Sequence, residues 1–208
     1  MKYLTLSMLF ILLSAPGFCE WTPVKIQIYE NLSIPKSRKV IGLNLNLYGY
    51  TPNVYGLQLG GGNAADNLYG IQIGVLPGNL LFISNIVSKM YGIQVSPILN
   101  MTSEITGIQF GGINLDTKKC HGIQIGVLKN EVIELYGFQA SLLNETTKQL
   151  TGIQFGAVNV AENVSGIQIG LINYCNQTLK GLQLGGLNIG GKKAILPYTI
   201  GINAGFGK

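Results

Sequence analysis

Apolar and polar residues alternate along most of the chain in a repeated pattern. Each repeat has the order apolar, any residue, Gly, Leu/Ile/Phe, Gln, apolar, small, and we number positions within a repeat from this glycine as zero. The zero glycines are Gly42, Gly56, Gly70, Gly92, Gly107, Gly122, Gly137, Gly152, Gly166 and Gly181. Successive glycines are 14 or 15 residues apart, except for one spacing of 22. Alternation with a period of two over positions −2 to +6 predicts a β-strand in every repeat.

The two faces of these predicted strands differ in chemistry. Positions +1, +3 and +5 are apolar, as in Ile167, Ile169 and Leu171. Positions zero, +2 and +4 form a belt of Gly, Gln and Gly or Ser, with apolar residues at −2 and +6. Polar segments rich in Asn, such as 144–147 and 173–176, separate the repeats and favour chain reversal. We therefore expect an all-β chain with no helix after residue 19.

Charged residues avoid the predicted strands. The chain has 14 Lys and Arg and 9 Asp and Glu residues, and only Lys180 among them lies within the ten nine-residue windows, where an even distribution would place about ten. Antiparallel sheets with one solvated face place polar residues on that face. The pattern therefore indicates that water does not cover the broad faces of these strands in the usual way.

Strand length favours an antiparallel meander over a parallel stack. A straight strand of nine residues extends about 26 Å at about 3.3 Å per residue, while five or six connecting residues span at most about 20 Å. With 24–29 and 198–206 as additional strands, ten repeats give about 12 strands, an even number that suits a closed outer-membrane barrel. The alternative is a β-solenoid with coils of about 15 residues, which requires corners at the glycines.

One column of Gln side chains at position +2 is the most distinctive polar feature. It comprises Gln58, Gln72, Gln94, Gln109, Gln124, Gln139, Gln154, Gln168 and Gln183. Amides on neighbouring strands can bond to one another, which predicts a hydrogen-bonded ladder in a narrow interior. The functional alternative is a water-filled lumen or a ladder that binds sugars.

The N-terminus has the features of an export signal. Lys2 is followed by an apolar segment, 4–13, and by small residues before Cys19. We expect a signal peptide at 1–19, cleaved after Gly17 or Cys19, and a single β-repeat domain at 20–208. Lipid attachment to Cys19 is disfavoured by Phe18 immediately before it.

Few residues are suited to catalysis or to cofactor binding. His121 is the only histidine, and no CxxC pair is present, so we expect neither a metal site, a cofactor, nor enzymatic activity. Cys120 and Cys175 form an even pair in an exported chain, but their spacing does not decide whether they form a disulfide. The net charge of +5 is scattered, which argues against nucleic-acid binding.

The opening, array and ending together resemble the leptospiral surface repeat-containing family. The similar stretches are 40–49 with 53–60, the Gly-Ile-Gln-Ile-Gly type repeats from 107 to 188, and 196–206. Departures are Ser96 and Ser141 at position +4 and the long connection at 77–89. The resemblance implies a surface or outer-membrane location with lipid as a partner, and it supplies no catalytic residues. If the chain is a solenoid, we expect it to be secreted or surface-tethered and to bind a protein or glycan.

Overall fold

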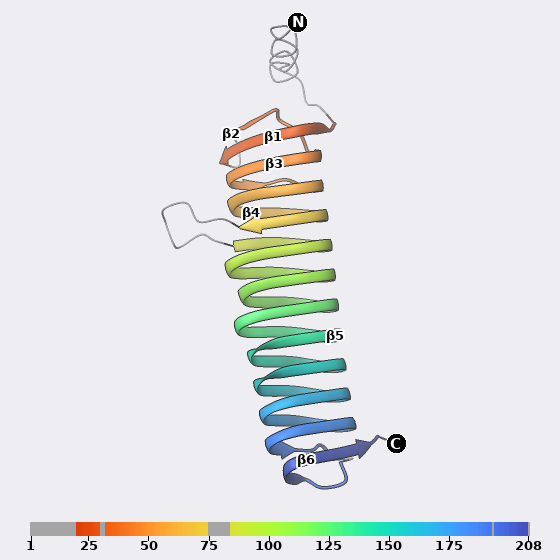
Figure 1. Ribbon diagram of the computed structural model, residues 1–208. Coiled ribbons are helices and arrows are strands. Elements are labelled where there is room, and N and C mark those ends of the chain that lie inside the picture. The colour runs from red at the N-terminus through yellow and green to blue at the C-terminus, as the bar shows by residue number, and fades with distance from the viewer. Residues whose placement is uncertain (1–19, 30–31, 75–83, 193, 208) are drawn as a thin grey trace, which may run out of the picture.

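The computed structural model shows a β-solenoid, in which the chain winds into stacked, flattened coils (Figure 1). The structure describes residues 20–29, 32–74, 84–192 and 194–207. The proposed signal peptide, Cys19 and most of the long connection lie outside these ranges. The strands are β1 (Thr22–Tyr29), β2 (Leu32–Ile34), β3 (Lys39–Tyr50), β4 (Asn53–Gly74), β5 (Ser84–Ile189) and β6 (Tyr198–Phe206). The described residues form no helix, as the sequence predicts.

The prediction of an antiparallel barrel of about 12 strands is wrong, and the solenoid alternative is confirmed. Neighbouring coils run parallel and in register, so that Gly42 pairs with Gly56 and Gln72 with Gln94. Strand β5 alone covers 106 residues because each coil remains paired with its neighbours as it bends.

The strand-length argument failed because each predicted nine-residue strand bends at positions +5 and +6. Two consecutive side chains face outward there, as at Val127 and Leu128, so most coils close within 14 or 15 residues. The zero glycines let neighbouring coils approach closely. All ten have positive φ, between 134° and 151°, a conformation that residues with a side chain rarely adopt. At Gly137, for example, an added Cβ would lie 2.0 Å from the carbonyl oxygen of Gly122 in the previous coil.

Both ends of the stack carry an antiparallel strand. At one end, β1 pairs parallel with β3 and antiparallel with β2. At the other, β6 pairs antiparallel with the last coil of β5, with Lys180 opposite Phe206. The strands expected at 24–29 and 198–206 are thus present, within β1 and as β6. Antiparallel strands at the ends interrupt the in-register parallel stack.

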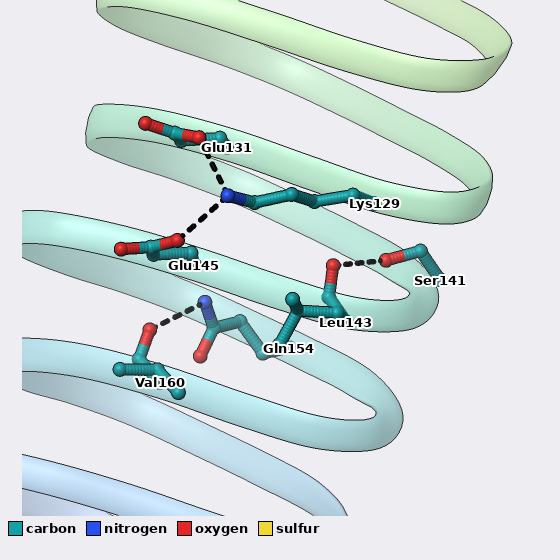
Figure 2. Close-up of polar contacts among 7 residues, drawn as sticks. All are labelled: Lys129, Glu131, Ser141, Leu143, Glu145, Gln154 and Val160. Atoms are coloured by element: carbon teal, nitrogen blue, oxygen red, sulfur yellow. Dashed lines mark hydrogen bonds and ion pairs between the residues drawn. The ribbon is translucent and has the colours of Figure 1, made fainter.

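The departures from the repeat do not interrupt the pairing. The register between β4 and β5 has the same offset of 22 residues at Gly62–Ser84 and at Tyr69–Tyr91, so the coil resumes its alignment after the long connection. Ser141 is accommodated at position +4, where its hydroxyl donates to the Leu143 carbonyl oxygen at 2.6 Å (Figure 2).

Candidate functional site

The Gln column forms a continuous ladder in the interior. From Gln72 to Gln183, each Nε2 donates to the Oε1 of the Gln one coil earlier, at 2.6–3.0 Å. All nine side chains are fully buried. Their amides therefore bond within the solenoid and do not face a glycan at its surface.

A second ladder, of Asn side chains, was missed by the sequence analysis. Its members are Asn63, Asn85, Asn100, Asn114, Asn130, Asn144, Asn159, Asn173 and Asn188. Each of the first eight Nδ2 atoms donates to the Asn Oδ1 one coil later, at 2.8–3.1 Å. It also donates to a carbonyl oxygen at position +3 of that coil, at 2.7–3.0 Å. An Asn seven or eight residues after most zero glycines was the available signal.

The interior of each coil consists of two facing layers. Position −2 contributes a column of buried apolar residues beside the Gln ladder. The second layer faces it and contains the residue two places after each Asn; the Thr102 hydroxyl, for example, donates across to Gln94 Oε1 at 2.9 Å. We call these facing residues the Asp116 column, which contains Thr, Ala, Val, Cys and one acid, Asp116.

Asp116 is a buried carboxyl group within this layer. Its Oδ1 accepts from Gln109 Nε2 and its Oδ2 from Gln124 Nε2, both at 3.0 Å. Burial raises the pKa of Asp116 well above its usual 3.8, although hydrogen bonds from Gln109 and Cys120 oppose the shift. The folded state therefore retains a proton that the unfolded chain releases, and stability falls as pH rises from about 4 through the raised pKa.

Asp116→Thr is expected to stabilise the fold at neutral pH. Thr102 and Thr146 occupy the same column and hydrogen-bond to Gln rungs, so a threonine suits this position without carrying a charge. We expect the free energy of unfolding in urea and mild detergent to rise by about 1–3 kcal/mol at pH 7 and by less at pH 4. Glu104→Thr removes an exposed carboxylate that pairs with Lys118 and should change stability by at most about 1 kcal/mol. Equal gains for Asp116→Thr at both pH values would contradict the buried-carboxyl explanation.

A lysine lies at the position of the Gln column in β1. Lys25 pairs in register with Asn44, is only 4% exposed, and donates to the Ser37 carbonyl and to Thr51 Oγ1 at 3.2 and 3.0 Å. Desolvation lowers the pKa of Lys25 to about 8. The next two residues of the column, Asn44 and Gln58, are not joined by a hydrogen bond, because Asn44 Oδ1 and Gln58 Nε2 are both buried without a partner. Asn is one methylene shorter than Gln, which explains why the ladder stops at Gln58.

The outer surface is apolar at one bend of the coil. We call positions +3 to +6 the apolar bend; Ser141 and Leu143 belong to it (Figure 2). Its position +5 carries some of the most exposed large apolar side chains of the stack, with Leu171 69%, Val127 68% and Leu142 57% exposed. Position +4 is Gly in seven of the ten repeats, and Asn46, Ser96 and Ser141 take the other three. At most of these glycines an added Cβ would collide with the Asn ladder or with backbone; at Gly156 it would lie 2.1 Å from the Ser141 carbonyl oxygen.

A shallow groove follows this bend along the solenoid. Over the coils from Gly122 to Gly181 it encloses about 790 Å³ and is lined by positions +3, +4 and +5. Phe155 and Ile169 line it at position +3, Leu142 and Leu171 at +5, and glycines at most of the +4 positions. A second groove at the same positions near the N-terminal end is lined by Ile26, Ile28 and Leu47, among others. The same apolar surface thus recurs at both ends of the stack.

The opposite bend carries a row of eight charged residues. We call the outward residues between the Asp116 column and position −2 the charged bend; it includes Asp66, Lys89, Glu104, Lys118, Lys119, Glu134, Lys148 and Glu162. Ion pairs join neighbouring coils, as in Lys119–Glu134 at 3.0 Å and Lys118–Glu104 at 3.4 Å. Between the two bends, Lys129 Nζ pairs with Glu131 at 2.7 Å and Glu145 at 2.9 Å (Figure 2). The cations and anions of the charged bend therefore largely neutralise one another.

Aromatic rings form a row on the outer surface at position −1, directly before the zero glycines. Tyr55, Tyr69 and Tyr91 stack in sequence, with ring centroids 4.9 and 5.0 Å apart. His121 stacks on Tyr136 in the same column at 4.7 Å. This row separates the apolar positions +1 and +3 from the charged bend.

The cysteines are not arranged as a nucleophilic site. Cys120 is fully buried while the adjacent His121 is exposed, and burial raises the pKa of the Cys120 thiol. Cys120 and Cys175 are both free thiols. Within the described ranges, no three His, Cys, Asp or Glu residues cluster as a metal site would require, and no helix there is long and apolar enough to cross a bilayer. Comparison with family models, curated proteins and solved structures finds no match.

Proposed function

We propose that the protein is an exported, non-enzymatic β-solenoid of the bacterial surface that binds to the cell envelope through its apolar bend. The observation that carries this proposal is the separation of charge from apolar surface. The apolar bend exposes large apolar side chains in several coils, as at Val127, Leu142 and Leu171, and eight charged residues lie at the opposite bend. Extended apolar patches on a protein surface are typical of interaction sites.

The interior supports a scaffold role. The Gln and Asn ladders use the polar side chains of the core to hold the coils together, and the buried cysteine next to His121 offers no accessible thiolate. The surface location follows from the signal-like N-terminus and from the family resemblance of the sequence. Identical coils repeat one binding surface many times, as solenoids commonly do.

Placing charge on the apolar bend is expected to release the protein from the envelope. We expect the triple variant Val127→Lys, Leu142→Lys, Leu171→Lys to move from the envelope fraction to the soluble fraction of the expressing cells. The exposed side chains make few interior contacts, so the variant should keep its β circular dichroism.

The matched control adds three lysines at or beside the charged bend, as Ser88→Lys, Thr147→Lys and Asn176→Lys. This variant should remain with the envelope, as the wild type does. Retention of both triple variants would contradict binding through the apolar bend. Protease treatment of intact cells should digest the wild-type protein, and complete protection would contradict the surface location.

A further inference from the structure

We propose that the apolar bend binds lipid by inserting into the hydrocarbon of one bilayer leaflet, while the charged bend faces water. This inference rests on the proposed function and names the partner of the same surface. It makes the apolar bend a monotopic membrane-binding surface, which enters one leaflet without crossing the bilayer.

The side chains of the apolar bend favour hydrocarbon over a folded protein as the binding partner. Charged side chains are absent from positions +3 to +6 of the ten repeats, and the groove is lined by aliphatic and aromatic residues, glycine and one serine. The Ser141 hydroxyl is already bonded to Leu143 O. Protein interfaces carry about one hydrogen bond per 100–200 Å², and this surface offers almost no groups to make them.

The backbone of the apolar bend is also compatible with a lipid environment. Parallel coils hydrogen-bond to their neighbours along the bend, and the Asn ladder satisfies further carbonyl oxygens at position +3. Irregular backbone is excluded from hydrocarbon because its N–H and C=O groups find no hydrogen-bond partners there. The internal ladders remove this obstacle because they bond the polar groups within the solenoid.

Shape distinguishes a bilayer from a second copy of the chain. Exposed apolar residues occur from the beginning to the end of the apolar bend, with Phe155 at position +3, Leu171 at +5 and Ile172 at +6. A second copy packed on one flank would leave the other flank exposed. Fluid acyl chains can follow the curve of the bend and fill the groove between positions +3 and +5.

The borders of the apolar surface fit the same orientation. In the N-terminal coils, Tyr55, Tyr69 and Tyr91 at position −1 lie between the apolar positions and the charged bend, and amphipathic aromatic rings favour the boundary between hydrocarbon and water. Ions of both signs pair along the charged bend, so attraction to anionic headgroups is not required. Binding should therefore depend little on lipid charge or on salt.

Tryptophan probes at the two bends test this orientation. In a Trp21→Phe background of the full chain, one variant carries Leu142→Trp at the apolar bend and the other carries Thr147→Trp near the charged bend. Each is reconstituted by detergent removal with phosphatidylcholine vesicles, with or without brominated acyl chains. We expect brominated lipid to abolish most of the fluorescence of Leu142→Trp and to leave Thr147→Trp nearly unchanged. Vesicle flotation should be the same with added phosphatidylglycerol and in 1 M salt, chosen as a strongly screening condition with a Debye length of about 3 Å.

The outcomes separate this inference from the proposed function. Absence of quenching at Leu142→Trp, or equal quenching of both probes, would overturn insertion of the apolar bend. Failure to float without phosphatidylglycerol would overturn hydrocarbon as the source of binding. If vesicle binding fails while the lysine variant is still released from the envelope, the proposed function stands and the envelope partner is not lipid. A dimer in sedimentation without vesicles, blocked by the same lysines, would identify a second copy as the occupant.

Discussion

Gly137→Ala is expected to cost about 4 kcal/mol or more of folding free energy, placing it among the most damaging single substitutions. The added Cβ would lie 2.0 Å from the Gly122 carbonyl oxygen, and the φ of 144° is unfavourable for alanine. Both conflicts involve backbone, which cannot move without breaking the pairing between coils. Urea unfolding in mild detergent measures the loss, and an unfolded variant is consistent with it.

Gly186→Ala is the matched control for this substitution. Gly186 lies at position +5, where other repeats carry Val127, Leu142, Ala157 and Leu171, so the column already accepts side chains. We expect its stability to stay within about 0.5 kcal/mol of the wild type. Wild-type stability of Gly137→Ala would show that the zero glycines are not required for the coil geometry.

Gln139→Leu should destabilise the solenoid by about 2 kcal/mol or more, because a buried group left without its partner costs about 1–3 kcal/mol. Gln139 donates to Gln124 Oε1 at 2.6 Å and accepts from Gln154 Nε2 at 3.0 Å. Leucine has a similar volume and makes neither bond, so the effect isolates the hydrogen bonds. Amide hydrogen exchange should be accelerated most in the coils on either side of the substitution.

Gln149→Leu provides the comparison outside the ladder. Gln149 bonds to Leu150 O and Ser165 Oγ but is only partly buried, so water can replace its bonds. We expect a loss below about 1 kcal/mol. If the two leucine variants were equally stable, the ladder would contribute little beyond filling the interior.

The periodicity of the sequence was sufficient to predict the β content, the repeat and the position of Gln in a column. Successive side chains of a β-strand point to opposite faces, so Gln168 points inward while Ile167 and Ile169 point outward. This alternation holds on each straight side of a coil, whatever the position of the bends. The same reasoning identified the strands at β1 and β6. The near-absence of charge from positions −2 to +6, where only Lys180 stands, also indicated an unusual outer surface.

The direction of pairing could not be derived from periodicity because it depends on where the predicted strands bend. A straight nine-residue strand is too long to return within one coil, which favoured an antiparallel barrel. The bend at positions +5 and +6, as at Val127 and Leu128, shortens the straight part of each window. Two consecutive apolar residues at these positions were the available sign of the bend.

The Asn ladder and the buried acid were harder to predict. Asn144 and Asn173 stand in segments whose composition is typical of turns, and turn propensity alone explains Asn there. Their inward orientation becomes evident only when the coils are stacked in register. Asp116 lies in a similarly polar segment, and its burial follows from its place two residues after Asn114 in the same layer.

The two amide ladders have opposite directions, which affects the electrostatics of a long stack. Gln side chains donate toward the N-terminal end, and Asn side chains donate toward the C-terminal end. Peptide-like dipoles aligned head to tail sum to partial charges at the ends, as they do in a helix. Because the two columns oppose each other, their dipoles largely cancel, and the backbone dipoles of a sheet also alternate. Adding or removing a repeat therefore leaves the potential at the ends nearly unchanged, so that the length of such an array can vary without an electrostatic penalty.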